Sequence, residues 1–228
     1  MSFKTYLWNK RTLVTRSPRF APIGSAILNI FSWAMRHNPL QVLSPRLRNA
    51  HYLNVGCGKK AQSGFLNLDF IWQPGVHLVW DLKWRLPIPP NSLSGIYTEH
   101  CLEHISLRLL TRRVLPEFRR ILAPGGTLRI IVPDAELYLK LYGDALAKPD
   151  VSFPYPEWDL PTPMMHVNEC FRGFGHQYAY DFATFRIILE QAGFKDIERL
   201  DYRHGRDPKL LIDSEDRRVE SLYLEAVK

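Results

Sequence analysis

Residues 52–58 read Tyr-Leu-Asn-Val-Gly-Cys-Gly, a short apolar strand that runs directly into a glycine-rich turn. Glycines at positions 56 and 58 allow a sharp bend, and they let the backbone approach a ligand where any side chain would collide. A second apolar run follows at 66–69 and ends in Asp69. A glycine turn after one strand and a carboxylate at the end of the next are typical of a nucleoside site, in which the acid accepts hydrogen bonds from the ribose hydroxyls.

Strand-like and helix-like segments alternate along the rest of the chain. Apolar runs bounded by turn residues predict strands at 51–55, 65–69, 76–80, 94–98, 127–132, 194–202 and 219–227. Apolar residues at helical spacing predict helices at 21–37, 101–122, 134–147 and 181–193. This alternation predicts an α/β protein with a doubly wound, mostly parallel seven-stranded sheet and an antiparallel edge strand.

Charge and proline content divide the 228-residue chain into regions. The first 60 residues hold ten basic residues and no acidic one, whereas the remainder holds twenty basic and twenty-three acidic residues. We therefore expect a basic, partly helical arm or cap at 1–48 and one domain at 49–228. We expect a long irregular loop at 149–163 and, with it, a lid over an acceptor site at 149–178, because loops of this length usually bind or cover ligands. The loop is rich in proline, with Pro149, Pro154, Pro156, Pro161 and Pro163.

The basic arm and the cysteines bear on location and partners. Cys57, Cys101 and Cys170 match no pairing motif, which indicates a reducing compartment. The apolar run 21–35 is too short to span a bilayer, so we expect a cytoplasmic protein. The arm could cap the nucleoside pocket, contact an anionic membrane peripherally or contact RNA; nucleic acid is the least favoured of the three.

Several segments together resemble the class I S-adenosylmethionine (SAM)-dependent methyltransferase superfamily. The turn at 53–58 is similar to its first motif, and Trp80-Asp81-Leu82 resembles its third. The segments 96–105, 118–128 and 192–194 are similar to the fourth motif, to the Pro-Gly-Gly segment before the fifth strand and to the late Ala-Gly-Phe turn. The short interval between Gly58 and Asp69 resembles small bacterial enzymes linked to surface-glycan synthesis.

The resemblance implies a Rossmann-like fold with SAM as its cofactor. Asp69 would bind the ribose, Asp81 the adenine amino group and Leu82 the adenine face. The cofactor-binding residues that the resemblance implies are Asn54, Gly56, Cys57, Gly58, Asp69, Asp81, Leu82 and Glu99. A dinucleotide fold is the rival, because the turn also fits G-x-G-x-x-A. In a dinucleotide fold, however, the acid that binds the ribose lies about 20 residues beyond the glycine motif, and Asp69 follows the motif too closely to match it.

His100, Glu103 and His104 form an H-x-x-E-H pattern, which on a helix places all three on one face. Alone it suggests a zinc hydrolase. Ubiquinone-biosynthesis and small-RNA 2′-O-methyltransferases are similar here, with E-x-x-E-H, and can hold a divalent metal. The metal-assisted alternative would methylate an RNA or quinone-type hydroxyl, with His166 or His176 as a further ligand. We favour the simpler interpretation, in which Glu103 and His104 hydrogen-bond the start of the helix without a metal.

Methyl transfer to a neutral hydroxyl also needs a base, and the pKa of histidine suits that task. We rank His176 first, because it lies in a cluster of glycines and aromatic residues, then His100 at a strand end and His166 in the proline-rich loop. The sequence therefore predicts SAM-dependent O-methylation of a saccharide or other small-metabolite hydroxyl. A SAM-binding scaffold without turnover is the non-enzymatic alternative.

Overall fold

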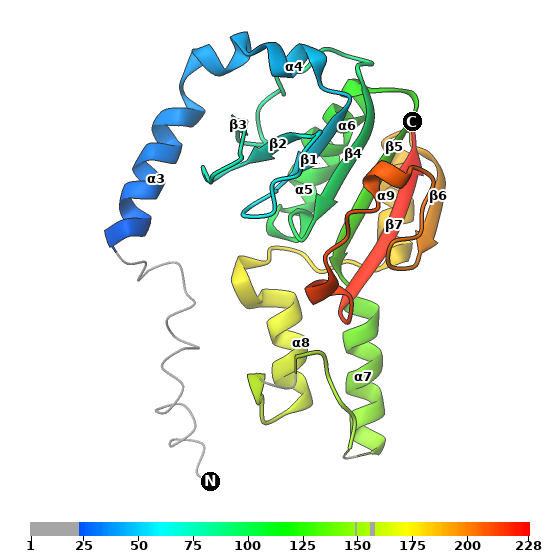
Figure 1. Ribbon diagram of the computed structural model, residues 1–228. Coiled ribbons are helices and arrows are strands. Elements are labelled where there is room, and N and C mark those ends of the chain that lie inside the picture. Colours follow the sequence, from blue (N-terminus) through cyan, green and yellow to red (C-terminus); the bar gives the residue numbers. More distant parts are fainter. Residues whose placement is uncertain (1–22, 149, 156–157) are drawn as a thin grey trace.

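The computed structural model describes residues 23–148, 150–155 and 158–228, whose arrangement is shown in Figure 1. Seven strands form one sheet in the order β3-β2-β1-β4-β5-β7-β6. Their bounds are Tyr52–Val55 (β1), Leu66–Asp69 (β2), Leu78–Val79 (β3), Leu93–Glu99 (β4), Leu122–Pro133 (β5), Lys195–Leu200 (β6) and Ser221–Val227 (β7).

The predicted fold class, a doubly wound, mostly parallel seven-stranded sheet with an antiparallel strand, is confirmed. Strands β1 to β5 pair in parallel, whereas β7 is antiparallel to both β5 and β6. The antiparallel strand lies one position in from the edge, which β6 forms. The chain leaves β1 toward β2 on one side, and β4 flanks β1 on the other. Ligands of such sheets bind at the carboxyl ends of the strands where the order reverses.

Helices and short turns connect and cover the strands. The α-helices are α3 (Ile23–Arg36), α4 (Pro45–Asn49), α5 (Leu107–Leu109), α6 (Leu115–Ile121), α7 (Ala135–Ala147), α8 (Pro163–Arg172) and α9 (Phe182–Gln191). The other helical turns are η2 (Pro39–Leu43), η3 (Leu102–His104), η4 (Leu110–Val114, a π-helical turn), η6 (Gly173–Gly175), η7 (Pro208–Leu210) and η8 (Glu215–Arg217). In Figure 1, α7 and α8 lie below the sheet, at the end where β5 leads into α7.

Two predicted elements differ from the structure. The helix expected at 101–122 begins only at Leu107, because the Ser106 hydroxyl caps it and residues 102–104 form the separate turn η3. The predicted lid segment 149–178 contains the helix α8, which begins at the last residue of the part expected to be irregular, 149–163. The sequence does signal the start of this helix, since Thr162 accepts a hydrogen bond from the Met165 N–H at 3.3 Å and Pro163 takes the first helical position.

The two faces of the sheet are covered differently. Ile96 lies in the main core with Phe118 of α6 and Phe185 of α9, all three fully buried. The next residue along β4, Tyr97, points to the opposite face, because side chains alternate along a strand. There it joins a second buried cluster with Leu210 of η7. The segment 201–220 covers this second face and is drawn in orange to red in front of β5 and β7 in Figure 1.

A buried ion network fastens the segment 201–220 to the sheet. Arg129 of β5 has no exposed side-chain surface, and its Nε donates to Asp213 at 2.7 Å while Nη2 donates to the second oxygen of the same carboxylate. Nη1 donates to Glu225 of β7 and to the carbonyl oxygen of His204, both at 2.9 Å. Removing Arg129 would therefore leave two buried carboxylates without their shared cation.

The described part of the arm packs along the β3 edge of the sheet. Gln41 accepts a hydrogen bond from the Val79 N–H at 2.9 Å, and Ser32 accepts one from the Trp72 N–H at 2.9 Å. The rings of Phe31 and Trp72 meet edge to face with centroids 5.2 Å apart. The predicted arm residues 1–22 lie outside the described residues. Among the described residues, no helix has the length and apolar character needed to cross a bilayer.

Candidate functional site

A cleft of about 760 Å³ lies at the carboxyl ends of β1, β2, β3 and β4. Its volume falls in the usual range of about 300–1,000 Å³ for small-molecule sites. Four of the predicted cofactor residues line it, namely Gly56, Asp69, Asp81 and Leu82, and so does His100. The cleft therefore lies where a doubly wound sheet is expected to bind its ligand.

Gly56 shapes the floor of the cleft. Its φ of 69° lies in the left-handed region, and a Cβ added there would be 2.5 Å from Sγ of Cys101. The N–H groups of Gly56 and Cys57 both donate to the carbonyl oxygen of Leu68, at 2.9 and 3.1 Å. Glycine is therefore required at position 56 by both its backbone conformation and the close approach of the chain after β4.

The Asp69 carboxylate organises the turn and faces the cleft. Its Oδ2 accepts a hydrogen bond from the Gly58 N–H at 2.7 Å, and its Oδ1 accepts one from the Ile71 N–H at 2.8 Å. Each carboxylate oxygen has a second lone pair. Asp69 can therefore hold the glycine turn and accept hydrogen bonds from a diol at the same time.

Asp81 and its neighbours line the cleft after β3. Asp81 accepts a hydrogen bond from the Lys83 N–H at 3.0 Å and pairs with Nζ of the same lysine at 2.8 Å. The indole N–H of Trp80, another cleft residue, is buried and has no hydrogen-bond partner among the described residues. Because buried donors are nearly always paired in native proteins, this N–H is a donor that a bound ligand can satisfy.

Two predicted cofactor residues support the glycine turn from outside the cleft. Gly58 contributes the N–H that holds Asp69. Asn54 is buried and donates to the carbonyl oxygen of Lys60 at 3.2 Å and to Oδ1 of Asn67 at 3.1 Å. Both residues therefore position the turn rather than line the cavity.

The two other predictions outside the cleft are Cys57 and Glu99. Cys57 is buried, and that burial, with a smaller contribution from the charge of Asp69, raises the pKa of its thiol to about 12. Glu99 accepts hydrogen bonds from the Ser214 N–H at 2.9 Å and from the Ser214 hydroxyl. It thus faces the segment 201–220, and the prediction that it contacts the cofactor is wrong for this arrangement.

Further cleft residues were not predicted as site residues. Phe70 and Ile71 follow β2, and Phe174 and Gln177 come from the end of the segment 149–178. That end is anchored to η3, since Gln177 donates through its N–H to the carbonyl oxygen of Glu103 at 2.7 Å and through Nε2 to that of His104. Trp80 lies beside the predicted site residue Asp81, and Phe174 and Gln177 belong to the predicted lid segment 149–178, whereas no sequence signal marked Phe70 and Ile71.

His100 projects from the end of β4 beside the cleft. Its φ of 48° is in the left-handed region, an uncommon conformation outside glycine. Its Nε2 lies 2.8 Å from the Ser221 hydroxyl, and its Nδ1 lies 3.6 Å from Oε1 of Glu103. Burial, followed by the charge of Arg217, lowers the pKa of His100 to about 3. The imidazole is therefore neutral at pH 7, and it is a weak base for a hydroxyl proton.

His176 and His104 adjoin His100. Nδ1 of His176 lies 2.7 Å from the carbonyl oxygen of Cys170, and the His176 and His104 rings meet edge to face with centroids 4.8 Å apart. Burial lowers the pKa of both imidazoles, that of His104 to about 4. His104 lines the cleft, whereas His176, the first-ranked base, lines a smaller cavity of about 190 Å³. His100 and His104 line both cavities.

Glu103 lies at the centre of these three imidazoles. Its residue surface is 1 % exposed, and neither carboxylate oxygen has a hydrogen-bond partner among the described residues. Burial raises the pKa of this carboxyl group to about 8. The favoured interpretation, in which the Glu103 side chain hydrogen-bonds the start of the helix, is therefore wrong.

His166 is not part of this site. It lies on α8 rather than in a loop, and its ring stacks on Phe153 with centroids 4.3 Å apart and an interplanar angle of 14°. Phe153 belongs to a small core cluster with Tyr138 and Cys170. The prediction of His166 as a base is thus corrected, because its ring packs in a separate core.

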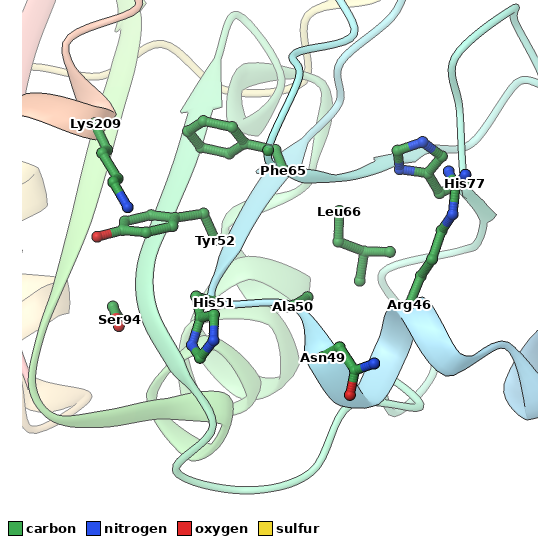
Figure 2. A pocket seen from close by; sticks show the side chains of 11 residues that line it. Arg46, Asn49, Ala50, His51, Tyr52, Phe65, Leu66, His77, Ser94 and Lys209 are labelled. Atoms are coloured by element: carbon green, nitrogen blue, oxygen red, sulfur yellow. The ribbon is translucent and has the colours of Figure 1, made fainter.

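A second pocket, of about 470 Å³, lies at the other end of the sheet, where β1 and β2 begin (Figure 2). On one side the Tyr52 hydroxyl donates to Asp207 at 2.8 Å and the Lys209 ammonium lies 5.1 Å from the centre of the Tyr52 ring. Arg46 and His77 lie together on the other side in Figure 2. No predicted site residue lines this pocket, so the carboxyl-end cleft is the candidate functional site.

Comparisons with known proteins give only distant likenesses. No protein-family model and no curated protein sequence matches the chain. Three solved structures that it resembles are SAM-dependent methyltransferases from Archaeoglobus fulgidus, Thermotoga maritima and Mesorhizobium loti. Their identities are 15, 14 and 17 %, their TM-scores 0.49, 0.49 and 0.48, and the alignments cover 87, 89 and 83 % of this chain and 98, 92 and 95 % of theirs. Sequence identities and TM-scores this low say nothing about activity, so the proposed activity rests on the cleft.

Proposed function

We propose that this protein is a SAM-dependent methyltransferase that binds SAM in the cleft at the carboxyl ends of the parallel strands. One observation carries the proposal: Gly56, Asp69 and Asp81 line a single cavity at the point where the strand order reverses. Asp69 accepts the ribose hydroxyls, the tight turn at Gly56 leaves room for the methionine portion, and Asp81 and Leu82 contact the adenine.

The cleft fits this ligand in shape and in hydrogen-bonding groups. The bend at Gly56 leaves the floor free of side chains, and the Trp80 N–H is a buried donor without a partner among the described residues. Leu82, Ile71 and Phe70 supply the apolar surface that an adenine ring needs. When bound, SAM supplies a methyl group on a sulfonium, which an aligned nucleophile displaces.

The acceptor is an oxygen, on a saccharide or another small metabolite. His100 and His104 line both the cleft and the smaller cavity, so the acceptor is expected where these two cavities meet. Phe174 and Gln177, at the end of the segment 149–178, border the same space and form the acceptor side of the cleft. Aromatic and amide side chains are suited to stacking on a sugar ring and to hydrogen bonding its hydroxyls.

Calorimetry with S-adenosylhomocysteine (SAH), followed by transfer from methyl-labelled SAM to fractionated glycan, lipid and metabolite pools, tests this proposal. We expect SAH to bind with one site per chain and label to enter a fraction as an alkali-stable ether. Absence of SAH binding would overturn the cofactor assignment. Binding of SAH without label in any fraction would instead support the non-catalytic scaffold.

We further propose that α3 and η2 place the enzyme on an anionic membrane surface. Ile30, Trp33, Leu40 and Leu43 are 58–68 % exposed, although they are large and apolar. They belong to the part of the chain that holds ten basic residues and no acidic one within residues 1–60. Exposed apolar side chains in a part of the sequence that has basic residues and no acidic ones match the interface of a bilayer that contains anionic lipids.

Sedimentation with phosphatidylserine-containing vesicles tests the membrane contact. Replacing Trp33 and Leu43 together by serine should weaken vesicle binding by about tenfold or more, because two apolar anchors are lost. The matched control replaces Ile187 of α9 and Val219, in the turn before β7, by serine; these side chains are 51 and 59 % exposed, and this variant should bind vesicles like the wild type. Equal binding of wild type to neutral and anionic vesicles, or no loss in the double variant, would contradict this proposal.

A further inference from the structure

We propose that Glu103, His104 and His176 form a binding site for one divalent transition-metal ion. One potential ligand atom from each residue lies within 4.8 Å of the others. Nε2 of His104 and Nε2 of His176 lie 3.9 and 4.0 Å from Oε1 of Glu103. The ligands of a tetrahedral zinc ion, with bonds of about 2.0–2.1 Å, lie about 3.3 Å apart, so small side-chain rotations bring the three atoms to that spacing.

The hydrogen bonds of the imidazoles favour a cation between them. A carbonyl oxygen only accepts, so Nδ1 of His176, bound to a backbone carbonyl, carries the hydrogen and Nε2 directs a lone pair toward Glu103. The Ser221 hydroxyl already donates to a backbone carbonyl, so Nε2 of His100 carries the hydrogen and its Nδ1 also directs a lone pair toward Glu103. These lone pairs converge on one carboxylate without a positive group of the described residues between them, and a metal ion bound by Glu103, His104 and His176 supplies that group.

The buried carboxylate is a second, independent observation. Both oxygens of Glu103 lack a hydrogen-bond partner among the described residues, although the residue is 1 % exposed. The neighbouring carboxylate, Glu220, is different, because Tyr138, Tyr155 and Arg217 all bond to it. A buried carboxylate without any partner is costly, and a bound cation removes that cost.

The donor set indicates which metal would bind. Two imidazoles and one carboxylate suit zinc and the neighbouring transition metals, whereas magnesium prefers oxygen ligands and keeps several waters. The bond from Nδ1 of His176 to the Cys170 carbonyl is the outer-shell contact that usually fixes a metal-binding imidazole. Three protein ligands leave a further coordination position free, as in catalytic rather than structural zinc sites.

The position of this site gives it a role in methyl transfer, and that role rests on the proposed function. Glu103 and His176 line the smaller cavity, and His104 lines both this cavity and the SAM cleft. A cation here draws electron density from an acceptor hydroxyl, which releases its proton to solvent water more readily. The oxygen then bonds to the methyl carbon as the carbon–sulfur bond breaks, and the electron pair of that bond stays on the departing thioether.

Metal binding can be measured without SAM. The purified full chain is stripped with a chelator, dialysed and titrated with Zn²⁺ by calorimetry, and Co²⁺ is added in parallel to record the visible bands of a tetrahedral site. We expect one ion per chain and a higher thermal midpoint with Zn²⁺. Glu103→Gln and His176→Ala should each weaken Zn²⁺ binding at least tenfold and lose the Co²⁺ bands. The control, His204→Ala, removes an exposed histidine and should bind like the wild type.

The possible outcomes are separable. No stoichiometric Zn²⁺ binding by the stripped wild type, or unchanged binding by Glu103→Gln, would overturn the metal site. If the two buried variants do not fold, His104→Ala decides, because its side chain is 40 % exposed and its loss should still weaken Zn²⁺ binding tenfold. SAH affinity is measured on the same proteins in chelator. If the wild type does not bind SAH, the proposed function is contradicted, whereas the measured Zn²⁺ binding is unaffected.

Discussion

Asp69→Ala is expected to weaken SAH binding by about 100-fold. Hydrogen bonds to a charged group contribute about 1.5–3 kcal/mol each, and two ribose hydroxyls reach one carboxylate, so a loss of about 3 kcal/mol corresponds to that factor. The same carboxylate also holds the N–H groups of Gly58 and Ile71. Its removal therefore loosens the glycine turn as well as removing the ligand contact.

Calorimetry of SAH with the variant and two companions measures this effect. Asp69→Asn keeps one acceptor oxygen but turns an amide toward a backbone N–H, so we expect a loss close to that of alanine. Asp144→Ala, which removes an exposed carboxylate on α7, is the control and should bind SAH like the wild type. An Asp69→Ala protein that stays folded and binds SAH with unchanged affinity would remove Asp69 from the cofactor site.

The second large effect concerns stability. Arg129→Met should lower the free energy of unfolding by about 3–5 kcal/mol, the usual cost of breaking a buried ion pair. The variant leaves Asp213 and Glu225 buried without their shared cation. Urea unfolding measures the loss. SAH affinity of the protein that remains folded should be unchanged, because Arg129 lies beneath the segment 201–220 and does not line the cleft.

Arg199→Met is the matched control for this prediction. Arg199 also pairs with two carboxylates, Asp134 at 2.7 Å and Glu136 at 2.8 Å, but its side chain is 47 % exposed. Exposed pairs contribute about 1 kcal/mol or less, so this variant should unfold at nearly the wild-type urea concentration. If the two arginine substitutions lower the free energy of unfolding equally, burial does not determine how much the Arg129 ion network stabilises the protein.

The sheet could be predicted, and half of the predicted cofactor residues do line the cleft, because both depend on local sequence. The glycine turn, Asp69 and Asp81 each follow directly on a short apolar strand, and parallel strands bring their carboxyl ends to one edge. Glu99 illustrates the limit. It shares the face of Tyr97, two residues earlier, and that face is covered by the segment 201–220. The alternation along β4 carries this information, but which face is covered depends on residues more than 100 positions away.

The histidines were harder to place because their neighbours come from distant segments. His100, Glu103 and His104 are close in sequence, but the turn η3 replaces the expected helix and turns Glu103 inward. His176 joins them only because residues 177 and 178 bond to the carbonyl oxygen of Glu103. His166 lies ten residues earlier than His176 and packs on Phe153 instead. The spacing of the histidines in the sequence could not predict that His176 lies beside Glu103 while His166 packs on Phe153.

The contact of Gln41 with β3 makes the described part of the arm a structural part of the sheet edge. β3 contains only two residues and forms the outer strand, so its Val79 N–H would otherwise face water. Oε1 of Gln41 accepts a hydrogen bond from that group, as a backbone carbonyl of a neighbouring strand would. Unprotected outer strands recruit other chains and lead to aggregation. A protein trimmed at residue 48 would therefore lose this hydrogen bond and expose the β3 edge of the sheet.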